Sequence, residues 1–330
     1  MIGRHVSRLS GYAPALPTPF RENGTVDVAA LEHLCDRQIE EGAMALVVCG
    51  TTGEAPTLDR REHDMVVRIA VAVAHGRVPV IAGAGSNSTS QAIELARAAE
   101  AAGADALLSV VPYYNKPMQA GMYAHFCAIA DSTGLPIILY DVPARTVCGL
   151  ADETIARLAE CPKFIGLKDA TGEVTRVRRL RSLLGAQFRL LSGDDATAPA
   201  FIGLGGNGCI SVTSNVAPGL CRTLYLALRQ GQVSRAQQLA AAVARLTEAL
   251  FIESSPVPVK YALSVMKMMS ATVRLPLVEL RSESKAQIDA ALAQMREAYS
   301  DHMVDCADLR RWGMRSFSSV ERKRNAVAMY

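Results

Sequence analysis

Short apolar runs alternate with amphipathic segments along the first two thirds of the chain. Most of the runs lack the strict apolar–polar alternation of a half-exposed strand, so they fit a parallel sheet that helices cover. Eight strands are predicted in this way, at residues 12–16, 45–49, 78–82, 106–110, 136–140, 164–167, 188–191 and 208–212.

The segments between these strands have the spacing of helices. We expect helices at residues 28–41, 60–74, 91–102, 118–131, 152–160, 173–184, 197–204 and 220–228. Asp27, Asp59 and either Ser88 or Thr89 can cap the first three, and Gly103 can end the third. Eight strand–helix units predict an α/β fold of the (β/α)8 TIM-barrel type. A doubly wound sheet is the alternative, but the sequence Pro-Thr-Pro-Phe follows the first strand where that fold usually has a glycine-rich turn.

The pattern changes after residue 218, where helices follow one another without strands. Three more helices are predicted, at residues 234–251, 258–269 and 285–299. We therefore expect a barrel with the active site in residues 1–231 and a C-terminal helical region in residues 232–300. Residues 301–330 are polar and basic, and we expect a loosely held tail there.

Composition narrows the class of protein. The chain has 330 residues, 50% of them hydrophobic, which is enough for a large core. Its net charge of +3 gives no reason to expect nucleic acid as a partner. No apolar run is long enough to span a membrane, and the N-terminus lacks the apolar core of a signal peptide. The eight cysteines form no Cys-x-x-Cys pair, so they are interpreted as thiols of a cytoplasmic protein without a zinc site.

Lys168 follows the apolar strand at residues 164–167, and it is the one lysine of seven with this placement. Burial of an amine disfavours its charged form and lowers its pKa. A neutral amine can attack a ketone and form a Schiff base. The structural alternative is a lysine that reaches from the strand end into solvent, and this strand alone does not decide between the two.

Other polar groups also follow predicted strands, at the barrel end where TIM-barrel chemistry is found. Thr51 and Thr52 lie in the run GTTGE, whose N–H groups and hydroxyls can hold a carboxylate. The phenol of Tyr140 can shuttle protons beside a lysine. Arg145 can bind a carboxylate through two parallel hydrogen bonds, unless it forms a structural ion pair with Asp141 or Glu54.

Two further strand ends are open to more than one interpretation. The tyrosines at residues 113 and 114 can relay protons or pack at a subunit contact. Asp194 and Asp195 have no histidine near them in the sequence, so a helix cap is favoured over a metal site. Taken together, a lysine, a tyrosine, an arginine and an anion cradle at one barrel end predict a Schiff-base lyase or aldolase.

The ordered motifs resemble those of the dihydrodipicolinate synthase family, within the pyruvate-dependent Schiff-base lyases. The resemblance extends from about residue 11 to residue 298. The motifs are GTTGE at residues 50–54, YYN at 113–115, Y-x-VP-x-RT at 140–146, GLKDATG at 166–172, LSGDD at 191–195 and PVPVK at 256–260.

The resemblance implies a role for each matching residue. Lys168 would form the imine with pyruvate, and Tyr140 would relay protons to and from it. Thr51 would link Tyr140 to Tyr114, which would reach into the site of the neighbouring subunit. The family is typically a homotetramer built as a dimer of dimers, and it uses no metal or organic cofactor.

The resemblance also implies how the substrates are held. The backbone around Thr51 and Thr52 would bind the carboxylate of pyruvate, and Arg145 would bind that of L-aspartate 4-semialdehyde. Gly193 and Ile210 would line the site through their backbones. The expected product is 4-hydroxy-tetrahydrodipicolinate, in the diaminopimelate route to lysine.

The chain departs from the family pattern at some positions. Asp141 stands where Asn is usual, and we expect that an added carboxylate there could compete for Arg145. Arg60 and Gln91 stand where lysine-inhibited members have His and Glu, so the resemblance does not extend to feedback inhibition by lysine.

These departures leave other functions open. One alternative is a lyase for another aldehyde or a 2-keto-3-deoxy sugar acid, similar to N-acetylneuraminate lyase. Thr52 and Arg145 favour the synthase, because sialic-acid lyases usually have Ser at the former position and lack the arginine. A binding protein that has lost its activity is a further alternative, and the complete set of Lys168, Tyr140 and the other implied catalytic residues argues against it.

Overall fold

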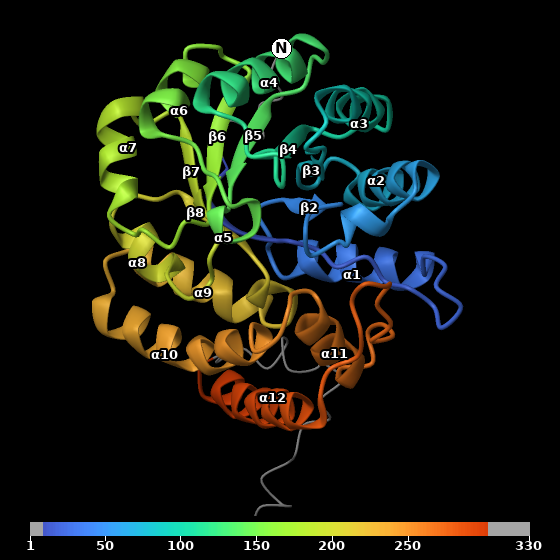
Figure 1. Cartoon of the computed structure of the whole chain (residues 1–330). Helices are drawn as coiled ribbons and strands as arrows, with labels where there is room; N and C mark the ends of the chain where they lie inside the picture. The colour runs from blue at the N-terminus through green and yellow to red at the C-terminus, as the bar shows by residue number, and fades with distance from the viewer. Residues whose placement is uncertain (1–8, 303–330) are drawn as a thin grey trace, which may run out of the picture.

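The structure is a computed structural model that describes residues 9–302, with side chains described up to residue 296. Eight parallel strands follow the order β1-β8-β7-β6-β5-β4-β3-β2, and a bridge between Ala15 and Val47 joins the two ends of the sheet. The predicted (β/α)8 barrel is therefore confirmed (Figure 1). The strands are β1 (Gly11–Pro14), β2 (Leu46–Val48), β3 (Val80–Gly83), β4 (Ala106–Val110), β5 (Ile137–Asp141), β6 (Phe164–Asp169), β7 (Arg189–Ser192) and β8 (Gly208–Ser211).

Helices surround the barrel, and three more follow it in the chain. Those of the barrel are α1 (Val28–Glu40), α2 (Arg60–Ala74), α3 (Thr89–Ala101), α4 (Gln119–Asp131), α5 (Pro143–Thr146), α6 (Asp152–Ala159), α7 (Arg176–Leu184), α8 (Ala198–Gly203) and α9 (Pro218–Arg229), with 3-10 turns η2 (Ala55–Thr57) and η3 (Thr213–Asn215). The later helices are α10 (Val233–Leu250), α11 (Val257–Val265) and α12 (Ser282–His302), which lie together below the barrel in Figure 1. Residues 303–330 of the expected tail lie outside the described residues.

The predicted caps form as the sequence suggests. The side chain of Asp27 accepts a hydrogen bond from the N–H of Ala30 at the start of α1. Asp59 and Glu62 form a reciprocal capping box at the start of α2. Ser88 is the residue that caps α3, and Gly103 follows that helix with a φ of +89°.

Two local predictions are wrong. The helix expected from residue 173 begins at Arg176, because Asp169 accepts hydrogen bonds from the N–H and hydroxyl of Thr171 and turns the chain first. The expected helix cap at Asp194 or Asp195 is absent, since α8 begins after Thr197. The carboxylate of Asp195 instead accepts hydrogen bonds from the end of β8, including one of 2.7 Å from the N–H of Val212.

Side chains alternate between the inside and the outside of the barrel, as expected for strands. A compact inner cluster includes Ile81, Leu108, Ile138, Tyr140 and Ile210. A larger cluster packs between the outer face of the sheet and the helices. The alternation places Tyr140 inside the barrel and directs the next residue toward the helices.

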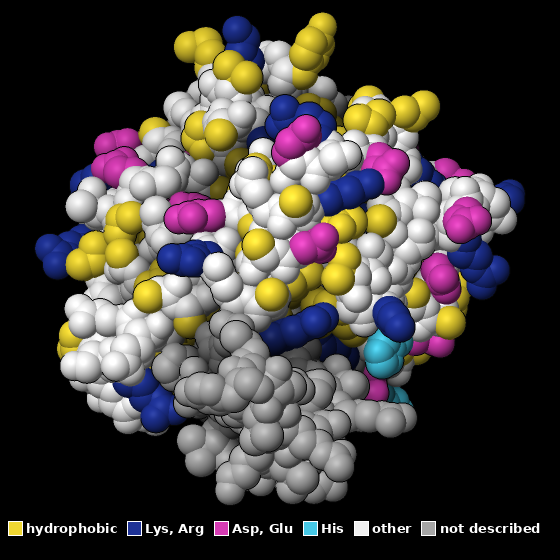
Figure 2. Space-filling view, turned by 90° about the horizontal axis from the view of Figure 1, so that it is seen from below, with side chains coloured by type: hydrophobic (Ala, Val, Ile, Leu, Met, Phe, Trp, Pro, Cys, Tyr) yellow, Lys and Arg dark blue, Asp and Glu magenta, His cyan; other side chains and the backbone are white. Residues whose placement is uncertain are grey.

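The surface carries both signs of charge. On the face seen in Figure 2, basic and acidic side chains are interspersed with apolar ones over the described residues. Within residues 9–302, none of the helices combines the length and the apolar character needed to cross a membrane.

Candidate active site

Lys168 and Tyr140 lie side by side at the ends of neighbouring strands. They are paired in register between β6 and β5, and each is 6% exposed. The ammonium nitrogen of Lys168 lies 4.2 Å from the centroid of the Tyr140 ring. The barrel thus brings together an amine and a phenol, as the sequence predicted.

Gly193 leaves the space that the Lys168 side chain occupies. A Cβ atom at this position would lie 3.0 Å from Cε of Lys168 and 2.9 Å from Cβ of Ala170. These distances are shorter than ordinary van der Waals contact, so any side chain here would displace the lysine. The structure gives Gly193 a steric role in addition to the predicted backbone role.

A cavity of about 510 Å³ opens at this end of the barrel. Thr51, Tyr140 and Arg145 line it, and Arg145 is exposed to solvent. Thr52 and Ile210 are buried and are not among the residues that line it. Arg145 is thus the one predicted substrate-binding residue that lines the described cavity, whereas Thr52, Gly193 and Ile210 do not.

The turn at residues 50–54 is tightly constrained. The N–H of Glu54 donates to the carbonyl of Thr51 at 3.1 Å, and the hydroxyl of Thr18 donates to the carbonyl of Gly53 at 2.7 Å. Cys49 and Glu54, on either side of the turn, have φ values of +54° and +53°. Residues with a Cβ atom rarely adopt this left-handed conformation, so the turn is held by its surroundings.

Asp141 is the last residue of β5, and its side chain does not line the cavity. Its Oδ2 is 2.8 Å from Nη1 of the buried Arg176 in α7, and burial raises its pKa above the usual value. The expectation that Asp141 competes for Arg145 is therefore wrong. The alternative pairing of Arg145 with Glu54 also fails, because Glu54 pairs with Lys260.

Arg176 is the residue of this region that the sequence did not reveal. Its guanidinium also contacts Asp152 at 2.8 Å and Asp169 at 3.5 Å. It therefore ties together the residues that directly follow Tyr140 and Lys168 in the chain. The one available signal was the unusual carboxylate at Asp141, which requires a buried cation once it is placed behind the sheet.

Tyr114 points away from the cavity of its own chain. It is 86% exposed and has a φ of +70°. Met118 and Val147 are similarly exposed, at 84% and 71%. These are large apolar side chains in the loops that follow β4 and β5, the loops beside the cavity.

The far end of the cavity is polar. It is lined by Arg60, His63, Gln91 and Glu94, among other residues. Nε2 of His63 lies 2.8 Å from the carbonyl oxygen of Gly83, and burial lowers the pKa of this imidazole. The two residues that depart from the lysine-inhibited pattern, Arg60 and Gln91, thus face the same cavity as Tyr140.

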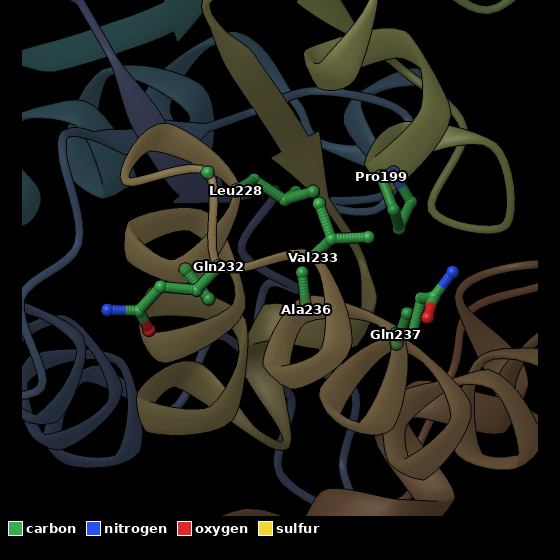
Figure 3. Close-up of a pocket in the computed structure, with 9 residues that line it drawn as sticks. Pro199, Leu228, Gln232, Val233, Ala236 and Gln237 are labelled. Atoms are coloured by element: carbon green, nitrogen blue, oxygen red, sulfur yellow. The ribbon is translucent and has the colours of Figure 1, made fainter.

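A second pocket of about 170 Å³ lies between α8, α9 and α10 (Figure 3). Pro199, Leu228, Val233 and Ala236 line it, together with the amide side chains of Gln232 and Gln237. None of the residues lining it is ionisable, so it offers neither an amine nor an acid or base for catalysis. The cavity beside Lys168 is the better candidate for chemistry.

Comparisons with known proteins agree with this site. The family model described as "Dihydrodipicolinate synthetase family" matches residues 8–295. A 4-hydroxy-tetrahydrodipicolinate synthase of Hyphomonas neptunium is 53% identical over 285 residues, which cover 86% of this chain and 97% of the relative. The corresponding protein of Cereibacter sphaeroides is 52% identical, over 86% of this chain and 98% of the relative.

Solved structures agree as well. The chloride-inhibited dihydrodipicolinate synthase of Acinetobacter baumannii, crystallised with pyruvate, is 43% identical and has a TM-score of 0.85. The match covers 87% of this chain and 99% of that structure.

Proposed function

The chain belongs to the dihydrodipicolinate synthetase family, and from that premise we propose how its residues carry out the reaction. It is a Schiff-base lyase that condenses pyruvate with L-aspartate 4-semialdehyde to 4-hydroxy-tetrahydrodipicolinate. The observation that carries the assignment of residues is the buried pair of Lys168 and Tyr140, of which Tyr140 lines the cavity.

The first half of the reaction forms an imine. The amine of Lys168 attacks the C2 carbonyl of pyruvate, and the carbinolamine loses water to give the iminium ion. Tyr140 supplies the proton that the departing hydroxyl needs and accepts one from the nitrogen. The nearness of the two side chains, with the lysine nitrogen 4.2 Å from the ring centroid, supports this role. Gly193 leaves room for the carbon attached to Lys168.

The second half of the reaction forms the carbon–carbon bond and closes the ring. Loss of a proton from C3 gives an enamine, which attacks the aldehyde carbon of the second substrate. The amine of that substrate then attacks C2 and displaces Lys168. The backbone N–H groups near Thr51 and Thr52 hold the carboxylate of pyruvate, and Arg145 at the cavity mouth binds that of the semialdehyde. Ile210 lines the site from β8.

The assembly is part of the proposal. Tyr114 carries a phenol that its own cavity does not use, and it is exposed beside two large apolar side chains. Apolar groups gathered on a surface commonly mark an interface. Tyr114 accordingly completes the site of a partner subunit through Thr51, in a homotetramer built as a dimer of dimers.

The proposal also covers the division of the chain into regions and its cellular location. The barrel, residues 1–231, carries the active site, and residues 232–300 form the C-terminal helical region. The location is cytoplasmic, which is supported by seven free cysteines among the described residues.

Borohydride trapping tests the assignment of the nucleophile. The protein is incubated with pyruvate and borohydride, and the adduct is located by mass spectrometry. We expect it on Lys168, and we expect Lys168→Ala to abolish it while Lys116→Ala, which removes an exposed lysine, leaves it intact. An adduct of full yield in Lys168→Ala would show that another lysine is the nucleophile.

A coupled assay tests the second substrate. Pyruvate and L-aspartate 4-semialdehyde are supplied together with the next reductase, and the loss of NADPH is followed. A kcat/KM above about 10⁴ M⁻¹s⁻¹ is expected, which is the ordinary range for an enzyme on its own substrate. Trapping of pyruvate without turnover of the semialdehyde would contradict the choice of aldehyde.

A further inference from the structure

The carboxylate of Glu54 is buried at the end of the turn 50–54, and it contacts residues from beyond the barrel. Its Oε1 forms an ion pair with Nζ of Lys260 in α11, and its Oε2 accepts a hydrogen bond of 3.0 Å from the N–H of Arg274. Figure 1 places α11 below the barrel, in the C-terminal helical region. Both oxygens of Glu54 are thus occupied by this region.

Lys260 is held as firmly as Glu54. It is 0% exposed, and its ammonium donates to the carbonyl of Thr272 at 2.9 Å. The nitrogen also lies 4.0 Å from the centroid of the Phe20 ring, a ring that the guanidinium carbon of Arg274 approaches to 4.1 Å. Burial lowers the pKa of Lys260 to about 8, against the opposing effect of Glu54. The charge of this lysine therefore depends on its partner.

Stability alone does not account for such a pair. Two buried charges lose their hydration, and an apolar pair of similar volume is often as stable or more stable. A buried ion pair does fix the direction and length of the contact more strictly than apolar packing does. Such a fixed contact can hold Glu54 in its backbone conformation, because a φ of +53° is unfavourable for a residue with a Cβ atom.

The backbone of Glu54 connects the ion pair to the cradle. Its N–H donates to the carbonyl of Thr51, and the next N–H, that of Ala55, donates to the carbonyl of Gly50 at 3.3 Å. A rotation of Glu54 out of the left-handed region would therefore move the peptide groups around Thr51 and Thr52.

We propose that Glu54 and Lys260 are positioning residues through which the C-terminal helical region holds the pyruvate-carboxylate cradle in its binding conformation. The inference rests on the proposed function, in which the turn 50–54 is that cradle. It assigns to the C-terminal region a part in the pyruvate half-reaction, although none of the region's described residues lines the cavity.

The test compares single and double variants. Glu54→Gln and Lys260→Met each leave one buried charge without its partner, whereas the double variant removes both charges and keeps the volumes nearly unchanged. The matched control is Glu279→Gln with Lys285→Met, because these residues form a Glu–Lys ion pair at the surface of the same region. Thermal unfolding is measured with kcat/KM for pyruvate and for the semialdehyde.

Because the imine forms before the aldehyde reacts, the two kcat/KM values report on the two half-reactions separately. We expect each single variant to unfold at a lower temperature than the parent. The double variant should recover most of this loss of thermal stability. In the double variant kcat/KM for pyruvate should still be roughly tenfold below the parent, with the value for the semialdehyde within about twofold. The control pair should change neither.

Two outcomes would overturn the inference. One is a double variant with the parent's kcat/KM for pyruvate, which would make the pair purely structural. The other is an equal fall in both kcat/KM values, which would mean a general loosening of the site. If the double variant does not fold, Glu54→Asp keeps the charge but shortens the side chain by one methylene group, and it should lower kcat/KM for pyruvate alone.

Failure of this inference is distinct from failure of the proposed function. If the parent protein forms the borohydride adduct at Lys168 and the double variant forms it with the same pyruvate dependence, only the positioning role is lost. If the parent forms no adduct, the cradle itself is wrongly assigned.

Discussion

Asp141 and Arg176 form a buried ion pair directly behind the strands that carry Tyr140 and Lys168. Their charged atoms are 2.8 Å apart, and both side chains are almost inaccessible to solvent. Asp141 also accepts a hydrogen bond from the N–H of Leu150. The carboxylate that departs from the family pattern is thus neutralised within the fold and is separated from the aldehyde site.

This ion pair predicts that substitution of Asp141 has little effect on activity, whereas substitution of Arg176 strongly lowers the stability of the fold. Asp141→Asn should leave kcat/KM for the semialdehyde within about twofold, because Asn can still accept a hydrogen bond from Arg176. Arg176→Met should lower the free energy of unfolding by about 3–5 kcal/mol, since it leaves buried carboxylates without a cation. Urea unfolding measures the second effect.

Arg179→Met is the matched control for Arg176→Met. Arg179 lies on the same helix and also pairs with Asp152, but its side chain is 52% exposed. Its loss should cost far less than that of Arg176, because solvent screens an exposed ion pair. Equal losses from the two arginines would contradict the distinction between a buried and a surface pair. A large fall in semialdehyde use by Asp141→Asn would return Asp141 to the active site.

The barrel and much of its candidate site could be predicted from the sequence, because both depend on patterns among residues that are close together in the chain. Eight apolar runs separated by helical spacing define the strands, and the candidate residues Thr51, Tyr140 and Lys168 lie at or within a few residues of strand ends. Lys168 and Tyr140 could be named in this way without knowledge of their packing.

Arg176 and Lys260 could not be predicted, because their roles depend on long-range contacts. Arg176 lies in an arginine-rich helix that resembles a solvated surface, and its burial follows only from the position of β5 and β6. Glu54 and Arg274 are 220 residues apart in the chain, so no local pattern relates them. The direction of Tyr114 likewise depends on its φ of +70° rather than on its neighbours in sequence.

Gly193→Ala should impair imine formation. The added methyl group would lie 3.0 Å from Cε of Lys168, and overpacking of this kind typically costs 1–3 kcal/mol. We expect kcat/KM for pyruvate to fall by about tenfold or more, measured together with the rate of borohydride trapping. Gly203→Ala in α8 is the control, because its Cβ would meet no atom within 4 Å. An unchanged trapping rate in Gly193→Ala would refute the steric role.

Arg145→Ala should affect the aldehyde and spare pyruvate. Loss of a charged hydrogen bond costs about 1.5–3 kcal/mol, or roughly ten- to 150-fold in kcat/KM for the semialdehyde. The kcat/KM for pyruvate should stay within about twofold, because that substrate binds at the cradle. Arg178→Ala removes an exposed arginine of α7 and serves as the control. If Arg145→Ala used the semialdehyde normally, its role in holding the carboxylate would be untenable.

His125 should make the fold sensitive to acid. Burial lowers its pKa from 6.5 to about 4, so the folded chain disfavours the protonated imidazole. This contribution is fully present above pH 6.5 and is lost as the pH falls toward 4, by up to about 3 kcal/mol. In His125→Gln the free energy of unfolding should fall less steeply over that interval, as measured by urea unfolding at several pH values.

Two comparisons make the acid prediction specific to His125. His63, whose pKa burial also lowers, contributes equally to parent and variant and cancels in the difference. His33→Gln changes an exposed histidine and serves as the control variant, in which the acid slope should remain that of the parent. Identical slopes for the parent and His125→Gln would refute the prediction.

Mixing two inactive variants tests whether Tyr114 acts in the partner's site. Lys168→Ala lacks the nucleophile but keeps Tyr114, and Tyr114→Ala has the reverse defect. In a mixed dimer, the site that retains Lys168 receives the intact Tyr114 of its partner. Each mixed dimer therefore contains one complete site of two, and random exchange should restore about a quarter of the parent activity.

As a control, Tyr114→Ala is mixed with the double variant Tyr140→Phe/Lys168→Ala. This double variant has two defects in its own site but keeps Tyr114, so it should restore the same activity to the Tyr114→Ala subunit. By contrast, Lys168→Ala mixed with Tyr140→Phe should restore nothing, because both residues belong to the same chain's site. If Lys168→Ala and Tyr114→Ala exchange subunits, as mass measurement of the mixture can establish, and no activity returns, then Tyr114 does not serve its neighbour. Its exposed phenol would then contribute only to the contact between subunits.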